Sequence, residues 1–313
     1  MREFSVSQRR ACRLLGMDRS SARYQSRTPR DDGEVPRVLA ELARRHPRYG
    51  YRRLWSELRD AGWKVNHKRV YRLYREGRLL LRRKQGRRLK HTGTALPLLE
   101  RPNQQWALDF VHDRIGEGRA LRVLTVLDEF TRECLTLEVD TGISSRMVAI
   151  ALERVIAERA VPTSLRLDNG PEFRSRYFAA WCRSRGIALD YITPGRPMQN
   201  GYIESFNGKL RDECLNLHCF RNLHHARECI GQWREHYNRT RPHSALGYLT
   251  PARFAQEWSA ALTRTAAPGS LALAVQSASA ADSDSAFFHF ALNHHEGRSE
   301  KMLLKEHDSH YRW

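Results

Sequence analysis

The chain has 313 residues, which is enough for one ordinary core with smaller appended modules and predicts two or three domains. Lys and Arg number 54 against 35 Asp and Glu, and the net charge of +19 favours a polyanionic partner, of which nucleic acid is the natural one. No apolar run is long enough to span a bilayer, and six scattered cysteines without a secretory signal argue against a disulfide framework, so we expect a bacterial-type, nucleoid-associated cytoplasmic protein with no membrane partner.

The first segment carries the signals of two short helices. Ser7 can cap a helix that Gly16 ends, and Ser20 can cap the next one. This outline predicts a helix-turn-helix segment over residues 1–30.

A second copy of the pattern is clearer. An amphipathic helix is predicted over 51–61 and stops at Gly62, and Asn66 caps another helix that ends before Gly77. We expect a second helix-turn-helix domain, with a basic arm, over residues 33–95.

The basic arm is the run RLLLRRKQGRRLK at 78–90, in which seven of thirteen residues are Arg or Lys and none is acidic. Such a run repels itself into an extended segment, and it is either a strap along the phosphate backbone or a solvated linker. We favour the strap. The residues predicted to contact DNA from this domain are Lys68, Arg69, Arg82, Arg83, Lys84, Arg87 and Arg88.

From Gln104 onward the pattern changes to strands. Three β-rich runs, WALDFV, LRVLTVLDEF and CLTLEVD, suit an antiparallel meander, and a helix capped by Ser144 or Ser145 follows. Further elements are a strand at 164–167, a helix near 174–185, a strand at 189–192 and a helix from Gly201. The order βββαβαβα is that of an α/β, ribonuclease-H-like core with a mixed sheet, preceded by all-α modules.

This core and a helical extension are predicted to occupy residues 100–258. Beyond it, residues 259–286 contain sixteen Ala or Ser without a sustained apolar face, which predicts a weakly ordered tail over 259–313.

Two acids are candidates for a metal-dependent site. Asp109 lies within an apolar strand, where a carboxylate is costly unless it is paired or binds a metal; the alternative is a salt-bridged acid on an edge strand. Asp168 closes the run SLRLD and precedes Asn169 and Gly170, at the kind of strand end where α/β sites lie; the tripeptide alone favours an ordinary turn.

A third acid, Glu204, shares a helical stripe with Asn207 and Arg211. Alone, this stripe is typical of a solvent-facing helix surface. The polar residues near the three acids are predicted to hold DNA phosphates, although simple surface polarity is an even alternative for each one: Asn169, Asn200, Asn207, Lys209 and Arg211.

The spacing of the acids adds weight, because 58 residues lie between Asp109 and Asp168, and 35 between Asp168 and Glu204. Together with the blocks HPRYGYRRLWSELRDAGWKVNHKRVYRLYREGRL, NQQWALDF, LRLDNGPEF, RPMQNGYIESFNGKLRDECLN and YNRTRPHSALGYLTPARF, this spacing resembles the DDE transposases of the third insertion-sequence family and the related retroviral integrases. The resemblance covers roughly residues 35 to 255.

The resemblance implies a catalytic triad of Asp109, Asp168 and Glu204 that holds two Mg²⁺ ions, with Mn²⁺ as a substitute. It also implies cleavage and strand transfer at the inverted-repeat ends of an element. The implied partners are double-stranded DNA of the terminal repeats and target, further copies of the chain on DNA, and the product of an upstream reading frame. The alternative is a catalytically inactive DNA-binding repressor derived from a transposase.

Other acids and a cysteine-rich segment compete with this interpretation. Glu172 is expected to be structural, and Asp128 is expected to form a local salt bridge with Arg132. The cysteines and histidines between 214 and 229 lack the spacing of a zinc site, which favours packing cysteines and surface histidines.

Overall fold

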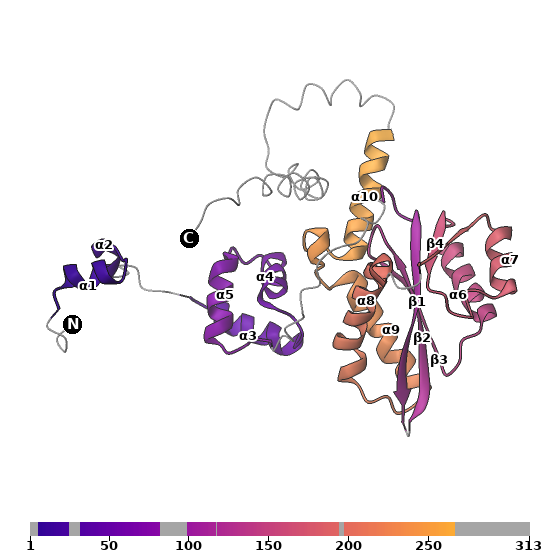
Figure 1. Cartoon of the computed structure of the whole chain (residues 1–313), viewed down its shortest axis with the longest axis horizontal. Coiled ribbons are helices and arrows are strands. Elements are labelled where there is room, and N and C mark those ends of the chain that lie inside the picture. The colour runs from indigo at the N-terminus through magenta and orange to yellow at the C-terminus, as the bar shows by residue number, and fades with distance from the viewer. Residues whose placement is uncertain (1–5, 25–31, 82–98, 117, 194–196, 267–313) are drawn as a thin grey trace, which may run out of the picture.

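The computed structural model of the protein describes residues 6–24, 32–81, 99–116, 118–193 and 197–266 (Figure 1). Helices come first along the chain, and a mixed α/β part follows. The helices before the sheet are α1 (Gln8–Leu14), α2 (Arg19–Arg23), α3 (Val35–Arg45), α4 (Tyr51–Asp60) and α5 (His67–Glu76).

The helices α3, α4 and α5 form a bundle with a core of its own. We call residues 35–79 the helical bundle. Each of its helices has one apolar face, and the fully buried side chains include Leu54, Leu58 and Val70. The helix-turn-helix outline predicted around Gly62 is present, with α4 and α5 as its two helices.

Side-chain caps mark the start of two of these five helices, α1 and α5. The Ser7 hydroxyl accepts a hydrogen bond from the Arg10 amide, and the Asn66 side chain accepts one from the Lys68 amide, as predicted. The prediction for Ser20 as a cap is wrong, because α2 begins at Arg19, so Ser20 lies inside the helix and Asp18 precedes it without a side-chain cap. An acidic residue at this position is also a favoured start, which the choice of serine overlooked.

The α/β part contains one five-stranded sheet in the order β3-β2-β1-β4-β5. Its first three strands are antiparallel, and β4 and β5 add parallel to β1. The strands are β1 (Gln105–Ile115), β2 (Arg119–Asp128), β3 (Cys134–Asp140), β4 (Ser164–Leu167) and β5 (Ala188–Tyr191).

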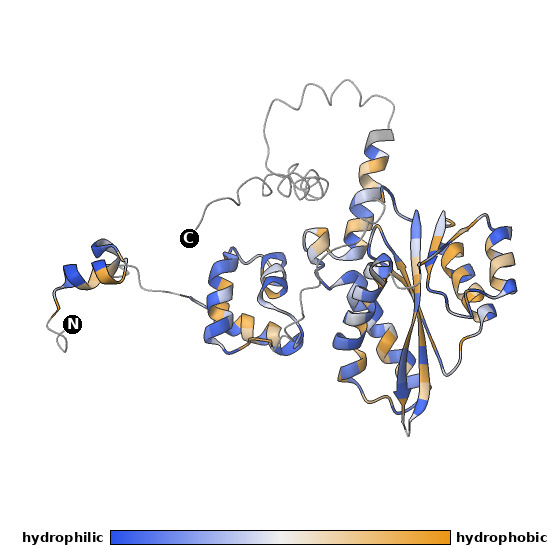
Figure 2. Cartoon of the chain, viewed as in Figure 1, coloured by the Kyte–Doolittle hydropathy of each residue, from blue (hydrophilic) through white to orange (hydrophobic). Residues whose placement is uncertain are grey.

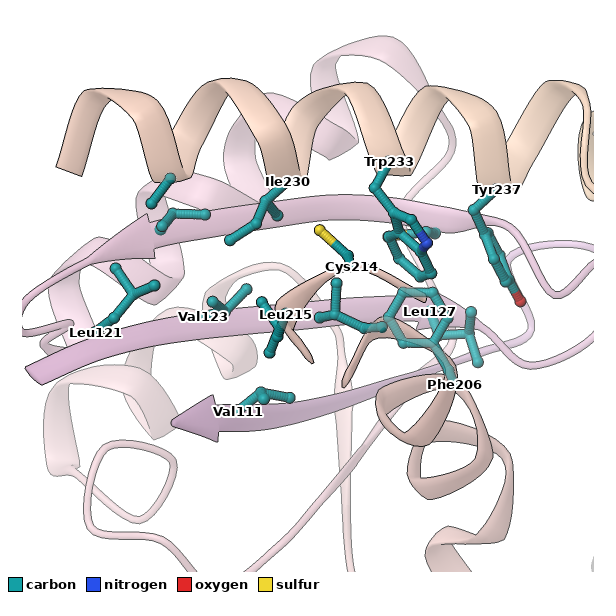
Figure 3. Close-up of a cluster of buried hydrophobic side chains, with 14 of the residues drawn as sticks. Val111, Leu121, Val123, Leu127, Phe206, Cys214, Leu215, Ile230, Trp233 and Tyr237 are labelled. Atoms are coloured by element: carbon teal, nitrogen blue, oxygen red, sulfur yellow. The ribbon is translucent and has the colours of Figure 1, made fainter. Parts of the chain in front are cut away.

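Helices cover both faces of this sheet, which makes three layers (Figure 1). On one face, α6 and α7 pack against strand residues that include Trp106 and Leu108. On the other, α8 and α9 pack against Ala107 and Val111 (Figure 3). The helices of this part are α6 (Ser145–Glu158), α7 (Arg176–Ser184), α8 (Gly201–Glu213), α9 (Leu223–Arg239) and α10 (Pro251–Ala266), with short 3-10 turns η1 (Pro197–Asn200), η2 (Leu215–Leu217) and η3 (Ser244–Leu246).

Successive residues of β1 belong in turn to the two cores, because successive side chains of a strand point to opposite faces of the sheet. Figure 2 shows the same division, with apolar residues on the inner sides of the helices. The observed βββαβαβα order, with helical modules before it, confirms the predicted fold class. Within the described ranges, no helix combines the length and apolarity needed to cross a membrane.

The predicted boundary at residue 258 falls inside α10, which continues to Ala266. The Ala and Ser content of this stretch suggested a tail, yet Ala is the residue with the highest helix propensity. Phe254 and Trp258 pack their rings against Phe130, at 5.7 and 4.8 Å between centroids. The start of α10 is therefore attached to the α/β part, and the predicted tail beyond 266 lies outside the described residues.

Candidate active site

Two of the predicted acids lie next to each other in the middle of the sheet. The parallel pairing of β1 with β4 sets Leu108 opposite Leu167, so Asp109 is the next residue of β1 and Asp168 is the first residue after the end of β4. Paired strands run about 4.8 Å apart. Two carboxylates that are separated by 58 intervening residues in the sequence are thus brought side by side.

The environment of Asp109 opposes its ionisation. Burial is the main cause that raises the pKa of this carboxyl group to about 6, and the negative charges of Asp168 and Glu204 contribute less. Two hydrogen bonds act in the opposite direction: the Phe110 amide donates to Oδ1 at 2.7 Å, and Asn207 Nδ2 donates to Oδ2 at 2.8 Å. The three predicted acids therefore interact electrostatically at one place.

A tight turn holds the carboxylate of Asp168. Its Oδ1 accepts a hydrogen bond of 3.0 Å from the Gly170 amide. A Cβ atom at residue 170 would lie only 2.9 Å from this oxygen, so glycine is needed for the close approach. The Asx turn that the sequence offered as an alternative is present, and it fixes the acid at the strand end.

Glu204 lies in the first turn of α8 and is exposed. The helix itself is fixed, because Ile203, Phe206 and Leu210 are buried in the core between α8 and the sheet. Acidic side chains are favoured in a first helical turn, where the helix dipole is positive. A rigid helix thus carries the third carboxylate to the edge of the Asp109 and Asp168 pair.

The donor set is suited to a hard divalent cation. Mg²⁺ and Mn²⁺ prefer carboxylate oxygens, and these three side chains offer nothing else. Among the described residues no three His, Cys, Asp or Glu side chains already stand in the arrangement of a metal site. Burial, with a smaller contribution from the charges of Asp168 and Glu204, disfavours the ionised form of Asp109, and a divalent cation would neutralise this carboxylate, so the residues fit such an ion chemically.

Two residues of α8 that were predicted as DNA contacts form hydrogen bonds with β1. Asn207 donates to the Asp109 carboxylate, and Arg211 Nη2 donates to the His112 carbonyl oxygen at 2.7 Å. In the sequence, these residues were noted because Glu204, Asn207 and Arg211 share one stripe of a helix. Their hydrogen-bond partners on β1 were not predicted. Asn207 therefore orients the carboxylate of Asp109.

The other predicted contacts near the site have mixed surroundings. Asn169 Nδ2 donates to the Ile192 carbonyl oxygen at 3.0 Å, and Asn200 is buried at 3% exposure. Lys209 donates to the Ser205 hydroxyl at 3.1 Å, and burial, followed by nearby arginines, lowers its pKa to about 8. DNA contacts by these residues remain predictions.

The helical bundle places its predicted contacts differently. Lys68 is exposed in the first turn of α5, whereas Arg69 Nε pairs with Asp32 Oδ1 at 2.9 Å. The predicted arm contacts lie outside the described residues: Arg82, Arg83, Lys84, Arg87 and Arg88.

The competing acids have structural partners. Glu172 pairs with Arg122 at 2.7 Å, as expected of a structural residue. The predicted salt bridge between Asp128 and Arg132 is wrong. The Asp128 carboxylate accepts hydrogen bonds from three backbone amides, and the Arg132 guanidinium lies 3.4 Å from the centre of the Tyr202 ring. A buried carboxylate in a turn is satisfied more cheaply by adjacent amides than by a long side chain.

Comparison with known proteins identifies the family. Residues 100–197 and 185–251 match the integrase core domain, and residues 29–87 match an HTH-like domain. A protein of insertion element IS407 from Burkholderia multivorans is 47% identical over 254 residues, which cover 80% of this chain and 91% of the relative. The transposase InsD of the IS2 elements of Escherichia coli is 31% identical over 238 residues, covering 71% of this chain and 77% of InsD.

The chain belongs to the family of insertion-element transposases. The resemblance predicted from the sequence is thereby confirmed, and transposition is favoured over a repressor without catalysis. Among solved structures, the catalytic core of HTLV-2 integrase in complex with magnesium aligns with the transposase at a TM-score of 0.39 and 20% identity, covering 49% of this chain and 97% of that core.

Proposed function

We propose that this transposase is a DDE-type polynucleotidyl transferase that cuts the ends of its insertion element and joins them to target DNA. Asp109, Asp168 and Glu204 are the proposed catalytic residues and the ligands of two Mg²⁺ ions, which Mn²⁺ can replace. The observation that carries the proposal is geometric: the parallel pairing of β1 with β4 brings Asp109 beside Asp168, and Asn207, on the same helix as Glu204, donates a hydrogen bond to the Asp109 carboxylate.

The residues of the chain prepare this chemistry by fixing oxygen ligands. When bound, the ions would supply a deprotonated nucleophile and stabilise charge on the reacting phosphate. Asn207 orients the Asp109 carboxylate through a direct hydrogen bond, and the Gly170 amide orients that of Asp168. Rigid elements hold both contacts, which is what a metal site requires of the residues behind its ligands.

The proposed substrate is double-stranded DNA, namely the terminal repeats of the element and the target. The net charge of +19 supports binding to a polyanion, and the HTH-like segment supports sequence recognition. The second helix of such a motif, here α5 with the exposed Lys68, enters the major groove. Assembly of several copies on DNA and a partner from an upstream reading frame belong to the same proposal.

The test is a cleavage assay on a linear fragment that carries the inverted repeat of the element encoding this chain. The wild-type transposase should cut at the repeat end with Mg²⁺ or Mn²⁺, and EDTA should abolish the cut. Asp109→Asn, Asp168→Asn and Glu204→Gln should each lower the rate by about a thousandfold or more, because such ligands act as a unit.

Asp113→Asn is the matched control. Asp113 lies four residues beyond Asp109 on the same face of β1, and its carboxylate accepts a hydrogen bond from the next amide, that of Arg114. This variant should retain nearly wild-type cleavage. Sequence-specific binding without any cut by the wild-type protein would instead support the inactive repressor.

A further inference from the structure

The helical bundle meets the α/β part through a polar seam. The seam joins the loop before α4 and the first turn of α4 to the end of α8, the end of α9 and the residues after α9. Its members are His46, Arg48, Tyr49 and Arg53 of the bundle and Asp212, Glu213, His236 and Arg241 of the α/β part.

Glu213 is the centre of the seam. Arg241 donates two hydrogen bonds to its carboxylate, from Nε to Oε2 at 2.6 Å and from Nη2 to Oε1 at 2.7 Å. Arg53 of the bundle donates from Nη1 to Oε1 at 3.0 Å. The Glu213 side chain is 8% exposed and that of Arg241 is 1% exposed, so solvent screens this carboxylate very little.

Aromatic rings complete the contact beside it. Tyr49 Oη and His236 Nε2 share a hydrogen bond of 2.8 Å, and the His46 ring stacks on Tyr49 with centroids 4.5 Å apart. Burial lowers the pKa of His46 to about 4 and lowers that of His236 as well, so both rings are neutral at pH 7. Arg48 also pairs with the Asp212 carboxylate.

No apolar cluster of the described residues spans the seam, since the bundle core and the two sheet cores are separate. Ion pairs and hydrogen bonds are directional, whereas apolar contact is not. A seam of this kind therefore determines the relative orientation of the two parts more than it contributes to the free energy of their association.

The seam is connected directly to the proposed active site by α8. Glu204 and Glu213 lie on this one helix, nine residues apart, which corresponds to about 13 Å along its axis. On the bundle side, Arg53 lies on α4, which packs against α5. The helix proposed to enter the DNA groove and the helix that carries a proposed metal ligand are thus linked through Arg53 and Glu213.

We propose that the Arg53–Glu213 contact, supported by Tyr49 and His236, sets which phosphodiester is cut relative to the DNA sequence that the bundle binds. Arg53, Tyr49 and Glu213 are positioning residues and do not touch the reacting atoms. The inference rests on the proposed function, because it concerns where the same active site cuts.

The test compares cut positions at nucleotide resolution. Arg53→Gln removes the bundle's cation and leaves the Arg241–Glu213 pair of the α/β part in place, and Tyr49→Phe removes one hydroxyl without changing the volume. Full-length variants are incubated with an end-labelled terminal-repeat fragment and Mg²⁺. The share of cuts at the wild-type position should fall by about fivefold or more in Arg53→Gln, with new cuts at neighbouring phosphodiesters. Tyr49→Phe should shift the cuts in the same direction.

Arg37→Gln is the matched control, because Arg37 is 71% exposed and pairs with Glu34 inside the bundle. It loses the same charge and should retain wild-type cut positions. Affinity for the repeat should be similar in all variants. Cut positions in Arg53→Gln and Tyr49→Phe that are identical to those of Arg37→Gln would overturn the inference.

Hydrogen exchange of α8 in the DNA-free chain separates the inference from the proposed function. Arg53→Gln should accelerate exchange near Glu213, and Arg37→Gln should not. A wild-type chain that makes no cut with Mg²⁺ or Mn²⁺ contradicts the proposed function. Unchanged exchange in Arg53→Gln contradicts the seam itself.

Discussion

The carboxyl group of Asp109 lies where a neutral side chain would be more stable. Burial, and to a lesser extent the charges of Asp168 and Glu204, raise its folded-state pKa to about 6, against an ordinary value of 3.8. A raised pKa adds stability that is fully present below pH 3.8 and is lost as the pH rises through 6. At pH 7.5 the ionised Asp109 carboxylate therefore lowers the free energy of unfolding of the metal-free protein by its full amount.

Asp109→Asn should accordingly stabilise the metal-free fold while it abolishes cleavage. We expect the free energy of unfolding at pH 7.5 to rise by about 1–2 kcal/mol, a value reduced for partial solvent screening, and the difference to vanish near pH 3.5. Urea denaturation at the two pH values measures this. A variant that is less stable than wild type at pH 7.5 would show that the acid is a structural residue.

Asn207 tests whether the orientation of Asp109 matters for the reaction. Its amide donates to Asp109 Oδ2, and its own Oδ1 is buried without a hydrogen-bond partner in the described part of the chain. Asn207→Ala should lower the cleavage rate by about 10- to 100-fold and raise the Mg²⁺ concentration at half-maximal rate. Asp113→Asn, the control variant of the cleavage assay, serves again here, and an equal loss in both variants would argue against a specific role of the amide.

At the scale of elements, local pattern predicted most of the α/β part. The strands β1 to β3 and the helix α6 follow from alternating or helical spacing and from a cap such as Ser144, all of which operate within a few residues. The parallel pairing that places Asp109 beside Asp168 was accessible only through the family spacing of the acids. Register between distant strands has no local signal.

Long-range contacts explain what the sequence did not predict. The Arg53–Glu213 pair joins residues 160 apart, and the Asn207–Asp109 bond joins residues 98 apart. Periodicity reports which face of a helix is polar but not which polar group it meets. For the same reason the predicted partner of Asp128 was wrong, because its carboxylate accepts hydrogen bonds from nearby backbone amides and does not pair with Arg132.

The helix α10 provides a test at this scale, because it runs through the predicted domain boundary. Trp258 packs edge-on against Phe130 beside β2, so α10 should contribute to the stability of the α/β part. Trp258→Ala should lower the free energy of unfolding by about 1–3 kcal/mol, measured by denaturant titration. The exposed Leu262 of the same helix is the control position, where substitution by Ala should change little. Equal, negligible effects at both positions would place α10 outside the cooperative fold.

At the scale of the whole molecule, recognition and chemistry are assigned to different parts. The helical bundle has its own core and a basic composition, and the three-layer α/β part holds the acids. The seam around Glu213 joins the two on the helix that also carries Glu204. Under the proposed function, this arrangement would let the transposase cut at a fixed distance from the sequence that its helical bundle binds.

The most direct test of the central claim is to locate a bound metal. Crystals of the transposase soaked in Mn²⁺ should show an anomalous peak at about 2.2 Å from carboxylate oxygens of Asp109 and Asp168, with Glu204 nearby. Asp168→Asn crystals soaked in the same way should lose it. A peak bound by other residues, or none at a Mn²⁺ concentration that supports cleavage, would contradict the assignment of these three acids.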